Sequence, residues 1–209
     1  MSQSNGATIA TTRMVFIRHG ETEWNASGRW QGHADVPLSA HGQRQAKALA
    51  QRLSMWQADA LICSDLRRAS ETAAFIGQTM SLPLIPDVAW REWDVGQFSG
   101  LTKAEIVERF PQYSGVGFFD APEGESISAF HFRIGRALAQ LVSRFRGETV
   151  LVVTHGGVIR MVLAHVFDTP PESYLPFALR ANTSITIVNA DAHGYRLAVL
   201  NDSAHLESI

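Results

Sequence analysis

Residues 14–20 read MVFIRHG and residues 150–157 read VLVVTHGG, so two apolar runs each end in a His-Gly pair. A continuous run of aliphatic and β-branched residues is typical of a central strand that is buried on both faces of a sheet. The carboxyl ends of such strands lie at the rim where open α/β sheets bind ligands. We therefore expect His19 and His155 to belong to one ligand site.

Strand and helix patterns alternate along the chain around these two runs. We expect strands at 14–18, 60–63, 83–86, 149–154, 184–188 and 195–200, and helices at 42–56, 67–80, 103–110, 126–145 and 157–166. Residues 20–25 and 90–100 are expected to be loops. Ser126 is the expected cap of its helix, with Gly124 and Glu125 as alternatives. The alternation predicts a three-layer α/β/α fold with a mostly parallel sheet, and the last two strands predict a hairpin, joined by a turn at 191–194, at one edge.

The chain is expected to form a single domain over residues 14–202. We expect a flexible N-terminal tail at 1–13, a C-terminal tail at 203–209, and a cap-like excursion over the surface at 101–125. The N-terminal stretch has no apolar segment typical of a signal peptide, and no apolar run approaches the length of a membrane span. These features favour a cytoplasmic protein without a membrane partner.

Composition narrows the functional classes. The 209 residues are 45% hydrophobic and 18% charged, which is ordinary for a globular domain. The net charge of −2 argues against a general role in binding nucleic acid. Sixteen of the 18 basic residues are arginine, the better bidentate partner for phosphate, although a composition bias of the source genome explains most of them equally well. The single cysteine, Cys63, excludes an internal disulfide and is expected to be a buried thiol.

Basic residues follow three of the predicted strands. Arg18 and His19 end the first strand, Arg68 stands near the start of the helix that follows the second, and His155 ends a later one. Two guanidinium groups and two imidazoles around one cavity suit a dianionic phosphoryl group. A helix start near Arg68 is itself favourable for an anion, and Gly20 permits close approach of the backbone.

Four motifs occur in a characteristic order: RHGET at 18–22, SDLRRASET at 64–72, REWDVGQFSG at 91–100 and THGGVIR at 154–160. In these motifs the chain resembles the histidine phosphatase superfamily, the phosphoglycerate-mutase-like proteins, from about Met14 to His165. The resemblance is to the phosphatase branch of that superfamily. It implies the α/β/α fold, a phosphomonoester hydrolase activity, and neither a metal nor a cofactor.

The resemblance also implies a role for each matching residue. His19 corresponds to the phosphorylated histidine and Glu92 to the proton donor. Arg18, Arg68 and His155 correspond to the rest of the catalytic phosphate pocket. The residues expected to bind the substrate phosphate are Arg18, Thr22, Asn25, Gln31, Gly32, Arg68 and Gly156.

These roles agree with the chemistry of phosphoryl transfer, in which positioning and positive charge do most of the work. His19 must be neutral to attack, and the neighbouring arginines disfavour its cation. We expect its other ring nitrogen to donate to a backbone carbonyl, and His155 to act as a charged or hydrogen-bonding clamp. Glu92 lies in an aromatic-rich loop, where an apolar surround would raise the pKa of its carboxyl and keep the acid usable.

Three alternatives remain open at this point. His19, His155 and Glu92 could bind zinc, but flanking arginines oppose a cation and no metal-ligand motif is present. A protein that binds a phosphorylated ligand without chemistry is a second alternative. The third is a cofactor-dependent phosphoglycerate mutase, which needs cations for the substrate carboxylate, whereas residues 92–125 contain only Lys103 and Arg109 as cations. Arg29 or Arg91 could still reach the pocket.

The surroundings of the site are predicted less sharply. Aromatic residues suit a phosphate ester whose non-phosphate part is apolar or of mixed polarity. The stretch 92–125, expected to cover the site, contains the aromatic residues Phe98, Phe110, Tyr113, Phe118 and Phe119. The tryptophans at 24, 30, 90 and 93 either line the substrate mouth or pack in the core. The remaining histidines, at 33, 41, 131, 165, 193 and 205, are expected to be surface or packing residues. The substrate is predicted to be a small phosphorylated metabolite, and homo-oligomerisation is left open.

Overall fold

Six strands form one mixed sheet at the centre of the molecule. The structure, a computed structural model, describes residues 10–114, 120–172, 181–207 and 209. The spatial order of the strands is β3-β2-β4-β1-β5-β6, and β1 to β4 run parallel, whereas β5 and β6 run antiparallel to their neighbours. The strands are β1 Thr12–Arg18, β2 Ala60–Cys63, β3 Leu84–Pro86, β4 Thr149–Thr154, β5 Ile185–Asp191 and β6 Gly194–Asp202. The mostly parallel sheet with an antiparallel hairpin at one edge is confirmed.

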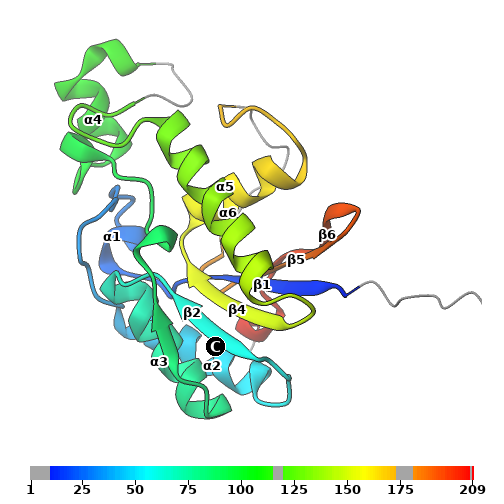
Figure 1. Cartoon of the computed structure of the whole chain (residues 1–209). Helices are drawn as coiled ribbons and strands as arrows, with labels where there is room; N and C mark the ends of the chain where they lie inside the picture. The colour runs from blue at the N-terminus through cyan, green and yellow to red at the C-terminus, as the bar shows by residue number, and fades with distance from the viewer. Residues whose placement is uncertain (1–9, 115–119, 173–180, 208) are drawn as a thin grey trace, which may run out of the picture.

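Helices cover both faces of this sheet, as Figure 1 shows. The helices are α1 Glu23–Ala26, α2 Ala40–Leu53, α3 Arg67–Met80, α4 Lys103–Arg109, α5 Ile127–Arg144 and α6 Gly156–Val166. On β1, Val15 and Ile17 pack in the core beneath α2 and α3, whereas Met14 and Phe16 pack in the core beneath α5 and α6. Because side chains of a strand alternate between faces and both faces are buried, the central residues of β1, Met14 to Ile17, are all apolar.

The register of the central strands brings the two His-Gly pairs together. Arg18 of β1 pairs with Thr154 of β4, so His19 and His155 leave the same edge of the sheet as neighbours. The backbone N–H of His19 donates to the carbonyl of Thr154 over 2.8 Å, which continues the pairing by one residue. In Figure 1, β1 runs from the N-terminal side of the molecule toward α1, so this edge faces α1.

Several predicted elements have different limits in the structure. The predicted loop at 20–25 contains α1, and the predicted loop at 90–100 contains 3₁₀ turns at Val88–Trp90 and Gly96–Phe98. α2 begins at Ala40 because the Ser39 hydroxyl accepts from the N–H of Gly42. The hairpin strands extend further than predicted, to Asp191 and from Gly194. Ser126 caps α5, as expected.

The two predicted tails need correction. β1 already begins at Thr12, inside the predicted N-terminal tail, and residues 1–9 of that tail lie outside the described residues. The predicted C-terminal tail contains a 3₁₀ turn, Ala204–Leu206, which packs against α2. Arg52 of α2 forms an ion pair with Asp202 and donates to Nδ1 of His205 over 3.3 Å, so this turn is fixed to the domain.

The predicted excursion over 101–125 contains α4 and a 3₁₀ turn at Pro111–Tyr113, and residues 115–119 lie outside the described residues. An isolated β-bridge between Arg29 and Thr102 ties its start to the loop that follows α1. No helix in the described ranges is both long enough and apolar enough to span a membrane.

Candidate active site

A cavity of about 290 Å³ lies at the carboxyl edge of β1 and β4. It brings together most of the residues predicted for the site, namely Arg18, His19, Asn25, Gln31, Gly32, Arg68, Glu92 and Gly156. His155 lies directly beside it, with its ring centroid 5.2 Å from that of His19. Of the predicted residues, only Thr22 takes up a different position.

His19 is held in the state that a nucleophile needs. Its side chain is buried, and Nδ1 donates to the carbonyl of Gly20 over 2.6 Å. The proton is therefore on Nδ1, and Nε2 keeps its lone pair. Burial, and then the positive charges of Arg68 and Arg18, hold the pKa of His19 well below its ordinary value. The expected neutral ring and the expected bond to a backbone carbonyl are both present.

His155 is fully buried and is neutral in the same way. Burial is the largest cause that lowers its pKa well below the ordinary value, and the charges of Arg68 and Arg18 lower it further. Its Nε2 lies 2.9 Å from the hydroxyl of Ser64, and its buried Nδ1 has no hydrogen-bond partner among the described residues. Of the two forms left open by the sequence, the structure favours the neutral, hydrogen-bonding one.

Arg68 presents a fixed positive charge to the cavity. Its Nη1 donates to the carbonyl of Ala34 and its Nη2 to that of Gly32, each over 2.8 Å. Its buried Nε has no hydrogen-bond partner within the described ranges. Burial lowers the pKa of Arg68 to about 10, opposed by the charge of Glu92, so the side chain stays cationic at neutral pH. Burial also lowers the pKa of Arg18. Two desolvated cations beside a cavity favour an anionic ligand.

Thr22 does not line the cavity and instead caps α1. Its hydroxyl accepts from the N–H of Asn25, while Oδ1 of Asn25 accepts from the N–H of Thr22, which is a capping box. Thr22 is therefore not among the residues that line the cavity, and its contact with the phosphate stays a prediction. The same box leaves the Nδ2 donor of Asn25 for the cavity, because its Oδ1 is already an acceptor.

Glu92 accepts hydrogen bonds at both carboxylate oxygens. The N–H of Trp93 donates to Oε1 over 2.9 Å, and the N–H of Gly157, at the start of α6, donates to Oε2 over 3.0 Å. The expected apolar surround is only partly present, because Trp90 and Phe98 are buried in the core, whereas Trp93 lines the cavity. Backbone N–H groups and nearby guanidinium charges are the main surroundings of this carboxylate.

The aromatic cover also differs from the prediction. Phe98, Phe110 and Tyr113 pack against one another, with ring centroids 5.2 to 6.4 Å apart. Trp30, Trp93 and Val95 form the apolar side of the cavity instead. Phe118 and Phe119 lie outside the described residues.

Of the two arginines that could still reach the pocket from other segments, Arg29 lines the cavity and Arg91 does not. Nη1 of Arg29 donates to Glu105 and to the carbonyl of Gly100. Arg91 forms a bidentate pair with Asp65 over 2.8 and 2.5 Å. Neither Lys103 nor Arg109 of α4 is among the residues described at the cavity.

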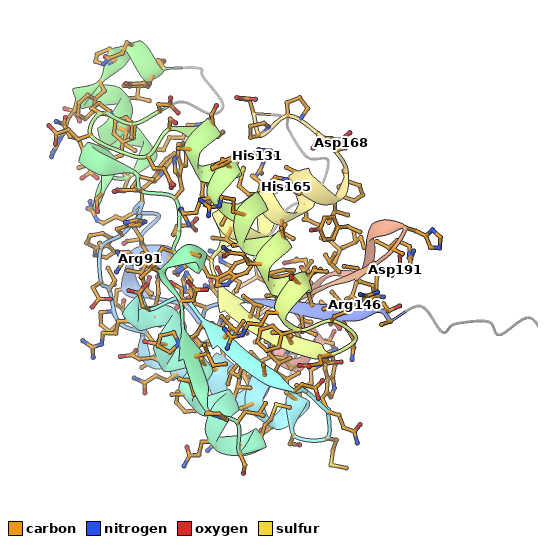
Figure 2. The ribbon with its side chains drawn as sticks, in the orientation of Figure 1. Arg91, His131, Arg146, His165, Asp168 and Asp191 are labelled. Carbon is orange, nitrogen blue, oxygen red and sulfur yellow. The ribbon has the colours of Figure 1, made fainter. Side chains whose placement is uncertain are left out.

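Two of the other histidines, all of which were expected to be surface or packing residues, pack against each other. In Figure 2, His131 of α5 and His165 of α6 lie together, away from Arg91, and their rings stack with centroids 3.9 Å apart. His33 differs, because its Nε2 lies 2.8 Å from the carbonyl of Glu92 and donates to it. Within the described ranges, no group of three or more His, Cys, Asp or Glu side chains is placed to hold a metal ion.

Sequence reasoning missed a second support of the nucleophile. Asn182 donates through Nδ2 to the carbonyl of His19 over 2.9 Å and to Oδ1 of Asn25 over 3.4 Å. The next residue, Thr183, has a φ of +56°, which is unusual for a β-branched residue. Its hydroxyl donates to the carbonyl of Asn182 and accepts from Nε2 of His205. No sequence pattern signals these contacts, since they join segments that are 163 and 22 residues apart.

Comparisons with known proteins agree with this geometry. Residues 14–203 match the model of the histidine phosphatase superfamily (branch 1). A metal-independent phosphoserine phosphatase of Arabidopsis thaliana is 34% identical over 206 residues, covering 95% of this chain and 84% of the relative. A probable phosphoglycerate mutase GpmB of Yersinia enterocolitica is 33% identical, covering 93% of this chain and 95% of the relative. The structure of a mycobacterial glucosyl-3-phosphoglycerate phosphatase in complex with VO3 superposes with a TM-score of 0.81 at 31% identity, covering 90% of this chain and 98% of that one.

The chain therefore belongs to the histidine phosphatase superfamily, as its motifs, its fold and this match over most of its length agree. It is an enzyme with the phosphatase activity of that superfamily.

Proposed function

We propose that this protein hydrolyses a small phosphomonoester without a metal ion, through a phosphohistidine intermediate on His19. One observation carries the proposal: Nδ1 of His19 donates to the carbonyl of Gly20, which leaves the Nε2 lone pair free to attack beside two buried arginines. A binding protein without chemistry would have no need of a desolvated, neutral imidazole in this state.

In the first step, the lone pair of His19 Nε2 forms a bond to phosphorus. The ester P–O bond breaks, and its electron pair stays on the leaving oxygen, which takes a proton from protonated Glu92. In the second step, Glu92 accepts a proton from water as the water oxygen attacks phosphorus. The P–N bond then breaks, and its electron pair returns to Nε2.

The charge that develops on the phosphoryl oxygens needs positive partners. Arg18 and Arg68 line the cavity as desolvated cations, and the Asn25 amide adds a donor. His155, Gln31, Gly32 and Gly156 complete the proposed phosphate site. Fixed guanidinium groups supply the charge that a divalent cation supplies in other phosphoryl-transfer enzymes, which is the basis for proposing metal independence.

The lining of the cavity suits a small phosphorylated metabolite whose leaving group is partly apolar and partly polar. Trp30, Trp93 and Val95 form an apolar side, and Arg29 adds a cation that is already engaged by Glu105. Three of the similar proteins are named as phosphatases of phosphoserine, glucosyl-3-phosphoglycerate and α-ribazole phosphate, which are all small phosphate esters.

A phosphoglycerate mutase is the second candidate, since similar proteins carry that name. The test supplies 3-phosphoglycerate with and without 2,3-bisphosphoglycerate and follows both 2-phosphoglycerate and inorganic phosphate. A parallel panel contains phosphoserine, sugar phosphates, nucleotides and α-ribazole phosphate. We expect release of phosphate from at least one ester to exceed isomerisation. Efficient isomerisation that is faster than any phosphate release would assign the mutase reaction instead.

A further inference from the structure

Arg133, near the middle of α5, contacts the segment that carries Glu92 at several points. Its Nη1 donates to the carbonyls of Ala89 and Arg91, each over 2.9 Å, and its Nη2 donates to the carbonyl of Glu92 over 3.3 Å. A single guanidinium therefore binds three carbonyls within four residues of the chain. None of the sequence motifs includes this residue.

The charge of Arg133 is balanced by the carboxylate of Glu125. Nε and Nη2 of Arg133 donate to the two oxygens of Glu125 over 2.9 and 2.7 Å, and both side chains are mostly buried. Glu125 itself is fixed to the segment, because its N–H donates to the carbonyl of Asp94 and its carbonyl accepts from the indole of Trp93 over 2.6 Å. A bidentate pair of this kind has little freedom to rotate.

These contacts bear on the direction of the Glu92 side chain. The carbonyl of Glu92 is held by Arg133 and, from a second donor, by Nε2 of His33 over 2.8 Å. Its carboxylate, at the other end of the residue, reaches the N–H of Gly157 on α6. His33 and Arg133 thus hold the backbone of the residue whose carboxylate contacts α6.

We infer that Arg133 is a positioning residue for Glu92: it fixes the backbone of residues 89–92 so that the proton donor meets the leaving oxygen. The inference rests on the proposed function, because it needs Glu92 to transfer a proton. Lysine cannot replace arginine here, since a single ammonium cannot reach the carboxylate and three carbonyls at once.

The experiment compares the variants R133K, R133M and E92Q with the parent on two substrates. p-Nitrophenyl phosphate has a leaving group that needs little protonation, whereas glycerol 2-phosphate releases an alkoxide that needs a proton. R136M, an exposed arginine one turn along α5, serves as the matched control. Thermal unfolding is measured for every variant. The double variant R133M/E92Q completes a double-mutant cycle.

We expect E92Q to lower kcat on glycerol 2-phosphate relative to p-nitrophenyl phosphate by about 100-fold. R133M and R133K should lower the same ratio by about tenfold, R136M should leave it at the parental value, and adding R133M to E92Q should not lower it further. R133K, the milder change, provides the readout if R133M does not fold.

Two results would overturn the inference, and they differ in what they say of the proposed function. If E92Q lowers the ratio but R133M and R133K lower both rates equally, Arg133 is a structural residue and Glu92 remains the acid. If E92Q itself leaves the ratio unchanged, the role of Glu92 fails together with that of Arg133.

Discussion

The backbone N–H of Gly157 donates to Oε2 of Glu92 over 3.0 Å, and a methyl group on Gly157 would stand 2.2 Å from Oε1. The second glycine of the THGG motif therefore keeps the space that the Glu92 carboxylate occupies. The sequence indicated a role for the first glycine after each histidine, but nothing in it indicates that the second one faces Glu92.

Replacing Gly157 by alanine should displace the Glu92 carboxylate without harming α6. Alanine is a better helix former than glycine, and the new methyl group meets only the end of the Glu92 side chain, so the thermal midpoint should not fall. We expect kcat on glycerol 2-phosphate to fall by roughly 10- to 100-fold, with a much smaller change on p-nitrophenyl phosphate. Steady-state kinetics on both substrates check this, and a parental ratio of the two rates would refute it.

Removal of the Asn182 amide should weaken phosphate binding rather than proton transfer. The N182A variant loses the bond to the His19 carbonyl and one of the hydrogen bonds that Oδ1 of Asn25 accepts. One lost hydrogen bond is worth about 0.5 to 1.5 kcal/mol, so KM should rise by roughly two- to tenfold on every ester. N182D should be worse, because its negative charge repels the phosphate. An altered dependence on the leaving group with an unchanged KM would contradict this account.

The half-buried His205 should make the protein sensitive to acid. Burial and the charge of Arg52 lower the pKa of His205 from 6.5 to about 4. The unfolded chain therefore takes up a proton at about pH 6.5 that the folded chain does not, so stability falls between about pH 6.5 and pH 4. H205Q keeps a donor for the hydroxyl of Thr183 but does not titrate. Its thermal midpoint should drop less than that of the parent between pH 7 and pH 5, and equal drops would count against this role.

Chelation should leave the activity unchanged if, as proposed, Arg18 and Arg68 supply the positive charge at the phosphoryl group. Dialysis against EDTA is expected to preserve kcat, and vanadate, which mimics five-coordinate phosphorus, should inhibit the chelated enzyme. Zinc chemistry at His19, His155 and Glu92 would be indicated by a large loss that added metal restores.

Local signals predicted the central strands and helices well. The limits of β2, α3 and β4 match the predicted ranges at both ends, because apolar runs and helix starts are encoded within a few neighbouring residues. α1 was missed because a helix of four residues has no periodicity to read, and only its capping pair, Thr22 and Asn25, marks it. The same box accounts for the position of Thr22 outside the cavity lining.

Contacts between distant segments account for the rest. Arg133 is 41 residues from Glu92, and Asn182 is 163 residues from His19. Neither residue stands in a motif, and each acts through the backbone of the residue that it supports. Likewise, the last residues look like a tail by composition, but the contact of His205 with Thr183 fixes them to the segment beside the nucleophile.

The central claim is that His19 carries the phosphoryl group during turnover. Parent enzyme and H19A are mixed with a ³²P-labelled ester, quenched within milliseconds, and digested to map the label. We predict an acid-labile, alkali-stable phosphoenzyme on the peptide that contains His19, none in H19A, and a loss of several powers of ten in the turnover of H19A. Label on another residue, or turnover in H19A close to that of the parent, would contradict the account.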